Sequence, residues 1–537
     1  MQPRRRRKFW GWGWEDEGLD PNEVARLAEL LAARFSLGSL DAQPPPRIEE
    51  ISLRPPRLSV PARFADIVTT EPHERISHSY GKSFRDLVRA WQRRYDNPVD
   101  AVAFPRNEEE LEAVLAWCDE KRIAAIPYGG GSSVVGGVEP PPDAAWPAAL
   151  SIDLCHFDRV REIDRLSRAA CIEAGVYGPA LEEQLKPHGL TLRHFPQSFE
   201  FSSLGGWIAT RSGGHFATLY THIDEFVQSL RVLTPTGWVE TRRLPGSGAG
   251  PSPDRLWIGS EGILGIITRA WMRLQDRPRF RAATSVFFSS FEDAVTAVRH
   301  ISQAGLYPSN CRLLDPVEAL TSGAGDGSTA VLVLAFESAD HPLDPWMERA
   351  LECCRDHHGR HDPESWRTRE DSTAARQGAA GAWRTSFLRA PYLRDAIVSL
   401  GMVSETFETA VTWDRFASLH QAVLHNVQEA LQRVCGAGQI SCRFTHVYPD
   451  GPAPYYTIIA PGRREALLEQ WEEIKRVASE TILAHGGTIT HHHAVGRDHR
   501  SWYDRERPAG FARALAAAKR SLDPNGILNP GVLIDPV

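Results

Sequence analysis

Three stretches in the first 120 residues place apolar side chains along one face of a helix. The sequence predicts helices over residues 22–35, within residues 71–95 and directly after Asn107. The apolar positions at helical spacing are Val24, Leu27, Leu30 and Leu31 in the first stretch, Phe84, Leu87, Val88 and Trp91 in the second, and Leu111, Val114, Leu115 and Cys118 in the third. Asn107 is a suitable N-cap, and Glu110 stands at the position that completes a capping box.

After the third helix the apolar pattern changes to short segments separated by turns. A buried strand is predicted at Ile123–Ile126, a helix at 176–187, and a turn at Leu204–Trp207, where two glycines allow close backbone approach. Farther on, we expect helices at 291–304 and 413–435 and a strand at 330–336. Helices and strands in irregular succession predict an α+β fold.

Composition restricts the function more than it restricts the fold. A chain of 537 residues is too long for one hydrophobic core and fits two or three domains. The 61 basic residues are balanced by 68 acidic ones, which disfavours a protein that binds nucleic acid through bulk charge. Internal repeats and coiled-coil heptads are absent from the sequence, which excludes solenoid and fibrous folds.

Cysteine use and hydropathy bear on the compartment. The eight cysteines, including the adjacent Cys353 and Cys354, have irregular spacing that matches neither a disulfide framework nor a zinc motif. No apolar run approaches the roughly 20 residues of a membrane-spanning helix. The chain ends in Asp535-Pro536-Val537 and not in a peroxisomal Ser-Lys-Leu signal. We therefore expect a cytoplasmic protein, with peripheral contact to the inner face of a membrane as an alternative.

The N-terminus has a composition of its own. A basic run, Arg4 to Lys8, leads directly into Phe9, Trp10, Trp12 and Trp14. Basic residues beside aromatic ones can hold a protein against an anionic membrane surface. The alternative, which we favour, is a frayed basic tail followed by tryptophans that pack on the body of the protein.

The stretch Ala124–Gly137, "AAIPYGGGSSVVGG", carries the first candidate chemistry. An apolar run opens into Gly129, Gly130, Gly131, Ser132 and Ser133. Glycines let successive N–H groups converge on an anion such as a diphosphate, although a glycine cluster alone is also typical of a flexible turn. The Rossmann fingerprint G-x-G-x-x-G at the start of a helix is absent, so a different cofactor cradle is required.

Two further glycine-containing segments decide between these readings. They are "SSLGGWIATRSGG", within residues 202–214, and "IGSEGILGIIT", residues 258–268. With the glycine loop, they resemble the FAD domain of the vanillyl-alcohol-oxidase (VAO) type flavoproteins. More narrowly, the chain from Trp10 almost to its end is similar to the alkyldihydroxyacetonephosphate synthase family, which makes ether lipids.

The resemblance implies a VAO/PCMH-type FAD-binding domain, an α+β cap domain for the substrate, and an N-terminal helical segment. The implied boundaries are residues 1–97 for the N-terminal segment, 98–277 for the FAD-binding domain, 278–508 for the cap and 509–537 for a C-terminal return to the FAD domain. It implies noncovalent FAD. The residues that it implies for the cofactor are Pro127, Tyr128, Gly129, Gly130, Gly131, Ser132, Ser133, Gln197, Ser198, Ser202, Ser203, Gly205, Gly206, Thr210, Arg211, Ser212, Gly213, Glu261, Gly262, Gly265 and Ile267. For Arg211, an ion pair with a surface acid is an equal alternative.

Three adjacent histidines, His491, His492 and His493, follow a glycine pair and a β-branched run. On a strand, successive side chains alternate, so His491 and His493 are expected to share one face. A metal site could use that pair, but a carboxylate or cysteine to complete it has no obvious place, and we expect no metal. A structural histidine pair is a further alternative. We favour an active-site role, and the resemblance implies one, because a triple histidine is typical of the ether-lipid synthases.

The same resemblance assigns three more residues. Arg312 stands where the synthases carry a required arginine, and Arg394 stands on the segment whose arginine binds the substrate phosphate. A guanidinium suits phosphate because its planar fork gives paired donors. Tyr455 matches the acid/base tyrosine, although Tyr456 follows it directly and a one-position slip stays open.

The implied reaction exchanges the acyl chain of acyl-dihydroxyacetone phosphate for a long-chain fatty alcohol, without net redox change. Catalysis would use Tyr455, Arg312 and the three histidines, with Arg394 on the phosphate and the flavin as an electron sink. The main alternative is an FAD-linked 2-hydroxyacid dehydrogenase or oxidase of the D-lactate or glycolate type. A flavin-binding protein without catalytic activity is a more distant one. We expect a homodimer that binds lipid-like small molecules and no nucleic acid.

Overall fold

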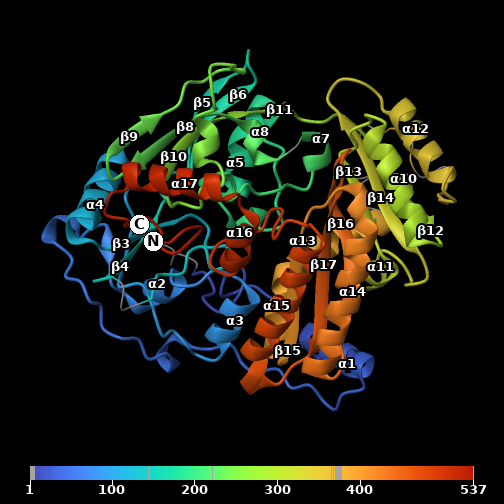
Figure 1. The fold of residues 1–537 in the computed structure, drawn as a ribbon, viewed down its shortest axis with the longest axis horizontal. Coiled ribbons are helices and arrows are strands. Elements are labelled where there is room, and N and C mark those ends of the chain that lie inside the picture. Colours follow the sequence, from blue (N-terminus) through green and yellow to red (C-terminus); the bar gives the residue numbers. More distant parts are fainter. Residues whose placement is uncertain are drawn as a thin grey trace.

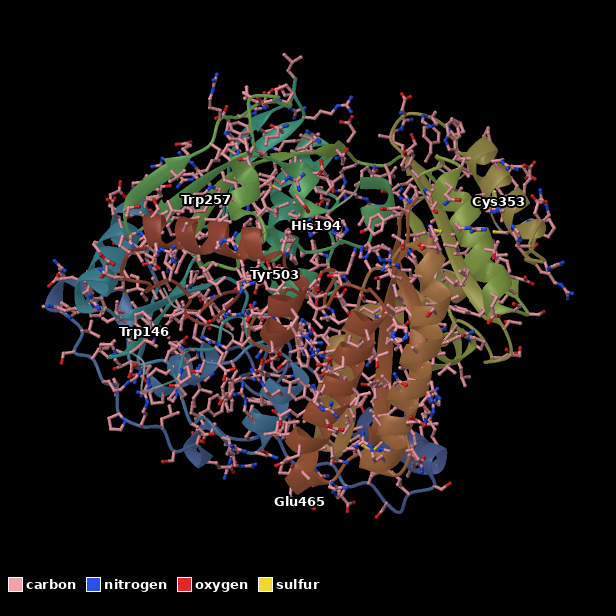
Figure 2. The ribbon with its side chains drawn as sticks, in the orientation of Figure 1. Trp146, His194, Trp257, Cys353, Glu465 and Tyr503 are labelled. Atoms are coloured by element: carbon pink, nitrogen blue, oxygen red, sulfur yellow. The ribbon has the colours of Figure 1, made fainter. Side chains whose placement is uncertain are left out.

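The computed structural model describes residues 6–142, 146–220, 222–363, 366, 368 and 378–535 of the chain. Its helices and strands build two hydrophobic cores that lie at opposite sides of the molecule (Figure 1). Trp257 belongs to the first core and Cys353 to the second, and Figure 2 shows them far apart. The predicted α+β fold is confirmed.

The first core lies between two sheets. The strands of the smaller sheet follow the order β1 (Val68–Thr69), β2 (Ala101–Ala103), β4 (Ala149–Asp153) and β3 (Ala124–Tyr128). Those of the larger sheet follow the order β5 (Val160–Asp164), β6 (Ala169–Glu173), β10 (Ile266–Arg273), β8 (Val227–Thr234) and β9 (Gly237–Glu240). Strands β3 and β4 are parallel, whereas the larger sheet is antiparallel throughout.

The helices around these sheets are short. They are α2 (Pro72–Ser77), α4 (Glu108–Lys121), α5 (Gly178–Leu185), α6 (Leu204–Thr210), α7 (Ala217–Tyr220), α8 (Ile223–Phe226), α9 (Asp254–Trp257) and α17 (Ala509–Leu522), and a two-residue ladder pairs β7 (Leu190–Thr191) with β11 (Gln275–Asp276). Helix α3 (Phe84–Trp91) instead packs its apolar face into the second core. Asn107 caps α4 as predicted, through a bond from the Glu110 N–H of 2.9 Å. A capping box would use the Glu110 carboxylate to accept from the Asn107 N–H. Instead it accepts from the N–H of Arg106, one position earlier, at 2.8 Å.

The Leu204–Trp207 segment is a helix, so the predicted turn is wrong. Ser203 caps α6 by accepting from the Gly206 N–H, and Trp207 and Ile208 are buried in the first core. Glycine is required at 205 because α6 packs directly on the backbone of the larger sheet. A Cβ there would lie 2.8 Å from the Ala174 Cβ and 3.1 Å from its carbonyl oxygen.

The second core is built on one antiparallel sheet of six strands. Their order is β12 (Phe280–Phe288), β14 (Ala330–Ser338), β13 (Asn310–Leu314), β16 (Gln439–Val447), β17 (Pro452–Pro461) and β15 (Met402–Glu408). The helices of this half are α10 (Phe291–Gln303), α11 (Pro316–Thr321), α12 (Asp344–Arg355), α13 (Gly378–Ser399), α14 (Trp413–Cys435), α15 (Leu467–Ala484) and α16 (Arg500–Glu506). In Figure 1, α14 and α15 run along this sheet, and both contribute buried residues to the second core.

Both ends of the chain pack onto these bodies. Helix α1 (Pro21–Phe35) places Ala28 and Leu31 against Ile397 of α13 and Leu400, which directly follows that helix. At the other end, Ala125 of β3 exchanges backbone bonds of 2.8 and 2.9 Å with Ile527 and Asn529, as expected for a C-terminal return. The boundaries of the four predicted domains stay a prediction.

The N-terminal aromatic residues pack on the body, which confirms one half of the interpretation that we favoured. Phe9 and Trp12 are 5% and 6% exposed. The frayed basic tail is wrong where the structure describes it, because Lys8 is buried and Arg7 donates to the Gly130 carbonyl. Arg4 and Arg5 of the basic run lie outside the described residues. All eight cysteines are free, and no helix in the described part of the chain is both long and apolar enough to span a bilayer.

Candidate active site

One cavity joins the two halves of the molecule. Its volume is about 360 Å³, within the usual range for ligand sites of about 300–1,000 Å³. Many of the site residues predicted from the sequence line this cavity. Those from the first half of the molecule are Pro127, Tyr128, Gly129, Gly130, Gly131, Ser132, Ser133, Gln197, Ser198, Ser202, Ser203, Gly205, Gly206, Thr210, Ser212, Gly213, Glu261, Gly262, Gly265 and Ile267. From the second half they are Arg312, Arg394, Tyr455, His492 and His493. Residues predicted for a cofactor and for a substrate therefore share one space.

The glycine loop forms a wall of this cavity directly after β3. Pro127 and Tyr128 are the last residues of that strand, so the loop itself starts at Gly129. A side chain at Gly130 would overlap the Phe201 carbonyl oxygen, and Gly131 has φ of +63°, which favours glycine. The Ser133 hydroxyl accepts from the Gly137 N–H at 2.9 Å and closes the loop.

Glu261 links the cofactor side of the cavity to the histidine segment. Its carboxylate accepts from the Val495 and Gly496 N–H groups at 2.9 and 2.8 Å. Burial raises the pKa of this carboxyl to about 7, although the two N–H donors oppose the rise. The Asn529 side chain donates to the Glu261 carbonyl at 2.8 Å, so the C-terminal segment supports the same wall.

Two of the predicted residues do not line the cavity. Arg211 ends α6 and forms an ion pair of 2.9 Å with Asp224, and its side chain is 62% exposed. This is the alternative that the sequence left open for it. His491 lies behind the cavity wall, with its Nε2 2.7 Å from the Tyr448 hydroxyl.

Adjacent tyrosines on β17 face opposite sides of the sheet. Tyr455 lines the cavity, with its ring 5.4 Å from the His493 ring. Tyr456 is fully buried in the second core, stacks on Phe407 and places its hydroxyl 3.1 Å from His420 Nδ1. The structure therefore resolves the one-position slip in favour of Tyr455.

Arg443, which the sequence analysis missed, lies across the Tyr455 ring. Its guanidinium carbon is 3.9 Å from the ring centroid, and Nη1 is 2.5 Å from a Glu318 carboxylate oxygen. Burial opposes the charge on Arg443, but Glu318 keeps the pKa of Arg443 above its ordinary value. A permanent cation thus lies beside the phenol. Its β16 position pairs directly with Tyr455, but only the strand register reveals this.

The two predicted arginines enter the cavity from different elements. Arg312 on β13 is buried, 3.0 Å from His215 Nδ1 and 3.4 Å from the Thr445 carbonyl oxygen. Burial and the nearby Arg443 lower the pKa of Arg312 to about 9. Arg394 on α13 donates to the Thr406 hydroxyl at 2.9 Å. An anion bound beside Arg312 would offset its repulsion by Arg443.

The three histidines lie in a tight bend and not on a strand, so the predicted alternation is wrong. Their three backbone N–H groups donate to the buried Glu408 carboxylate at 2.7, 3.0 and 2.9 Å. Burial would raise the pKa of Glu408, but the imidazoles and the Thr490 hydroxyl keep it well below its ordinary value. Burial in turn lowers the pKa of all three imidazoles, which favours their neutral forms.

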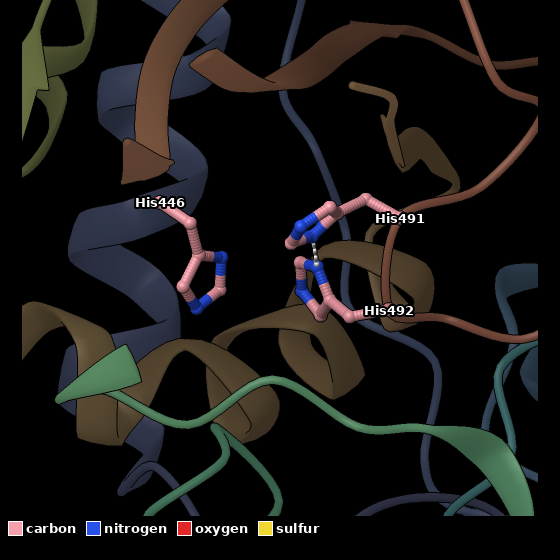
Figure 3. Close-up of side chains that lie close together, drawn as sticks. All are labelled: His446, His491 and His492. Atoms are coloured by element: carbon pink, nitrogen blue, oxygen red, sulfur yellow. Dashed lines mark hydrogen bonds between the residues drawn. The ribbon is translucent and has the colours of Figure 1, made fainter. Parts of the chain in front are cut away.

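His446 joins His491 and His492 in a group of three imidazoles that face a common space (Figure 3). One nitrogen from each lies within 4.8 Å of the others, close enough to hold a transition metal, so the expected pair of His491 and His493 was the wrong combination. The same group forms a chain of polar contacts from Tyr448 through His491 to His492, with Nδ1 atoms 3.0 Å apart. That chain ends at the cavity.

Sequence reasoning missed several functional candidates besides Arg443. They are Trp12, His215, Glu318, Glu408 and His446. Their signal is tertiary, because each becomes notable only through a partner more than 80 positions away along the chain.

Comparisons with known proteins agree with this geometry. A family described as "FAD binding domain" matches residues 99–242, and one described as "FAD linked oxidases, C-terminal domain" matches residues 277–533. Alkyldihydroxyacetonephosphate synthase of Dictyostelium discoideum is 31% identical over 516 residues, which cover 92% of this chain and 84% of that protein. A solved structure of an alkyldihydroxyacetonephosphate synthase matches with a TM-score of 0.80 and 26% identity over 98% of both chains.

A dehydrogenase is more distantly similar. The mitochondrial D-lactate dehydrogenase (cytochrome) of Arabidopsis thaliana is 27% identical over 478 residues, or 88% of this chain and 78% of that protein.

Proposed function

The chain belongs to the alkyldihydroxyacetonephosphate synthase family, and from that membership we propose that it is an FAD-dependent alkyl transferase of ether-lipid synthesis. It exchanges the acyl chain of acyl-dihydroxyacetone phosphate for a long-chain fatty alcohol, without net redox change. The observation that carries this proposal is the shared cavity, in which the glycine loop and the set Arg312, Arg394 and Tyr455 line the same space.

The residues present fit noncovalent FAD. The loop Gly129–Gly131 offers backbone that any side chain would obstruct, and the hydroxyls of Ser132, Ser198 and Ser202 line the same cavity. These groups would hold the diphosphate, while Gly205 and Gly206 leave room for the ring system. When bound, FAD supplies an electron-accepting ring that stabilises a carbanion next to the substrate ketone.

We assign the substrate phosphate to Arg394 and Arg312. Both reach the cavity from the second half of the molecule, and both remain donors at neutral pH. Charge-assisted bonds from guanidinium to phosphate hold the three-carbon unit in a fixed orientation.

Tyr455 removes the proton from the carbon next to the ketone. The proton moves to the phenol oxygen, and the Arg443 guanidinium against the ring stabilises the negative charge that the base carries before transfer. The bond to the acyloxy oxygen breaks and the fatty acid leaves as its carboxylate. The alcohol oxygen then bonds to that carbon and releases its proton. Tyr455 returns its proton to the same carbon, so the net products are the ether, the fatty carboxylate and one proton.

His492 and His493 shape the pocket beside Tyr455. Their neutral rings donate or accept hydrogen bonds without adding charge, and Glu408 fixes their backbone. We propose that His492 passes the alcohol proton to His491 and Tyr448, which continue the chain of polar contacts away from the cavity.

A two-part assay tests the function. Purified protein is incubated with acyl-dihydroxyacetone phosphate and hexadecanol, and the alkyl product and released fatty acid are measured by mass spectrometry. We expect both products in equal amounts, with the flavin spectrum oxidised at the end. Anaerobic bleaching by D-lactate or glycolate, with no alkyl product, would instead identify a 2-hydroxyacid dehydrogenase whose arginines bind carboxylate.

We also propose a homodimer and a peripheral contact with the inner face of a membrane. The support is the lipid nature of both substrates, which are delivered most directly from a bilayer surface. Sedimentation equilibrium gives the oligomeric state, and co-sedimentation with anionic vesicles tests the contact. A monomer that stays in the supernatant would refute both proposals.

A further inference from the structure

The N-terminal residues 6–15 form a hairpin that reaches the glycine loop. Arg7 and Trp14 pair as an antiparallel bridge, and the Lys8 N–H donates to the Gly13 carbonyl at 3.0 Å. From this hairpin, Arg7 Nη1 donates to the Gly130 carbonyl at 2.6 Å. Trp12 lines the cavity itself. A segment about 120 positions away along the chain therefore completes the predicted cofactor site.

Arg7 is held in place by aromatic rings. Its guanidinium carbon is 4.8 Å from the Tyr177 ring centroid, 5.4 Å from that of Phe201 and 5.8 Å from that of Trp14. Such contacts stabilise a cation and limit its side-chain motion. The Tyr177 hydroxyl donates to the Gly129 carbonyl at 3.2 Å, so this cluster holds two successive carbonyls of the loop.

Fixing these carbonyls orients the N–H groups of the loop. In a trans peptide the C=O and the following N–H point in opposite directions, and no cis bond occurs in the described chain. With the Gly129 and Gly130 carbonyls turned toward Tyr177 and Arg7, the N–H groups of Gly130 and Gly131 point the other way. This arrangement pre-orders the donors that an anionic diphosphate needs.

Arg7 does not line the cavity itself, so it acts on the loop from the side opposite the N–H groups. A half-buried guanidinium behind a loop of convergent amides raises the local positive potential, which attracts a diphosphate.

The other side of the hairpin holds the helix that carries Arg394. The Trp12 N–H lies 3.0 and 3.2 Å from the two Asp395 carboxylate oxygens, and Lys8 Nζ is 3.4 Å from Asp395. A side chain at Gly11 would overlap that carboxylate, so glycine is required at this close approach. The hairpin thus contacts both the glycine loop and Asp395, the residue next to Arg394 of the candidate phosphate site.

We propose that residues 6–15 are a cofactor strap, in which Arg7 is a positioning residue that pre-orders the glycine loop for the FAD diphosphate. Basic residues at this terminus thereby act on the cofactor. The proposal depends on FAD binding and not on alkyl transfer, so failure of the transfer assay leaves it standing.

The test is an FAD titration of the full-length chain after removal of its flavin. Arg7→Ala is compared with Arg6→Ala, a matched control that removes the same charge from an exposed neighbour in the hairpin. We expect the FAD dissociation constant, read from flavin fluorescence, to rise at least tenfold for Arg7→Ala and less than twofold for Arg6→Ala. The melting temperatures of the two flavin-free variants should agree.

Two conservative variants separate charge from hydrogen bonding. Arg7→Lys keeps the charge and Arg7→Gln keeps a donor for the Gly130 carbonyl. We expect both to bind FAD with intermediate affinity, and the dissociation constant of Arg7→Gln to depend less on salt than that of the wild type.

An unchanged dissociation constant in Arg7→Ala overturns the proposal. If Arg7→Ala does not fold, unchanged constants in both conservative variants overturn it equally. A melting temperature of the flavin-free Arg7→Ala protein far below that of Arg6→Ala would assign Arg7 a purely structural role and also reject the strap.

Discussion

At the scale of single residues, the register of the sheet decides which of two adjacent tyrosines faces the cavity and can accept a proton. Tyr455 and Tyr456 have the same chemistry and neighbouring positions, but one lines the cavity and the other fills the second core. Arg443 and Glu408 both pair with Tyr455 across the sheet, so a cation and the anchor of the histidine bend lie on either side of it. The local geometry favours a proton acceptor at position 455 alone.

Tyr455→Phe should retain FAD and lose turnover. Removing a general base typically lowers the rate by about 10²–10⁴, because the proton has no positioned acceptor. The matched control is Tyr456→Phe, which removes a hydroxyl bonded to His420 and should keep kcat while losing about 1 kcal/mol of stability. Product formation per bound flavin is measured for both. Wild-type turnover in Tyr455→Phe would remove this residue from its role.

Arg394→Ala should raise the KM for acyl-dihydroxyacetone phosphate and lower kcat/KM by about 10- to 100-fold. The physical reason is the loss of charge-assisted bonds worth about 1.5–3 kcal/mol. Arg389→Ala is the control on the same helix, since it breaks only an ion pair with Glu23 in which Arg389 is 51% exposed. Equal kinetic effects of the two substitutions would contradict the phosphate assignment.

At the scale of elements, helix α6 and the bend at His491–His493 each depend on a single residue, Gly205 for the helix and Glu408 for the bend. Helix α6 needs a residue without a side chain where it crosses Ala174, and the bend needs one carboxylate to accept three N–H groups. Gly205 lines the cavity, and Glu408 holds His492 and His493, which line it, so each feature can be tested through stability as well as activity.

Gly205→Ala should destabilise the protein by about 1–3 kcal/mol, because its Cβ would overlap Ala174. Gly206→Ala is the matched control in the same helix. Its Cβ would meet only the Ser203 hydroxyl at 3.4 Å, and alanine favours the helix by up to about 1 kcal/mol. Melting temperatures measured on flavin-free protein distinguish them. The reverse order of stabilities would contradict the close contact between Gly205 and Ala174.

Glu408→Gln should lower the free energy of unfolding by about 2–3 kcal/mol and reduce activity. An amide places its NH₂ group against N–H donors that the carboxylate satisfied, which leaves buried donors without acceptors. Glu429→Gln on α14 is the control, because the Glu429 side chain is 70% exposed. Urea titration of the two variants provides the comparison, and equal midpoints would show that the bend holds without its anchor.

For the whole molecule, the two cores meet at a cavity rich in buried titratable groups. His194 lies behind Ser212 of the cavity lining, near the middle of the molecule in Figure 2. It is 1% exposed, and its Nε2 is 2.8 Å from the Ser212 hydroxyl. Burial raises the pKa of carboxyls such as Asp315 to about 7, so their contribution to stability falls as the pH rises, whereas that of a buried neutral histidine falls as the pH drops. The pH dependence of one group is therefore best measured as a difference between variants.

His194 should contribute to acid unfolding. Burial, aided by the charge of His222, lowers the pKa of His194 to about 3, below the value of about 6.5 in the unfolded chain. The unfolded state binds more protons below pH 6.5, so this contribution to stability is present above pH 6.5 and is lost as the pH falls.

His194→Gln should therefore lose about 2 kcal/mol less stability than the wild type between pH 7.5 and pH 5. His425→Gln, at a 70% exposed position, should follow the wild type. Urea unfolding of the three proteins at both pH values gives one stability difference for each. An equal loss in His194→Gln and the wild type would show that His194 is charged in the folded protein.

The sequence by itself determined the features that depend on local order. Helical spacing placed α4, α10 and α14, and the glycine loop marked the cofactor wall, because periodicity and backbone freedom are properties of neighbouring residues. Arg312, Arg394 and Tyr455 were found through a family resemblance. The bend at His491–His493 could not be foreseen, since its cause is Glu408, more than 80 positions earlier.

Only the tertiary structure decided which side chains share the cavity. Arg443 lies over Tyr455 through strand pairing, Arg211 turns away to Asp224, and Arg7 reaches Gly130 across about 120 positions. Each of these contacts depends on long-range packing, in which the free energy of burial and of ion pairing selects one arrangement among many that the local sequence permits.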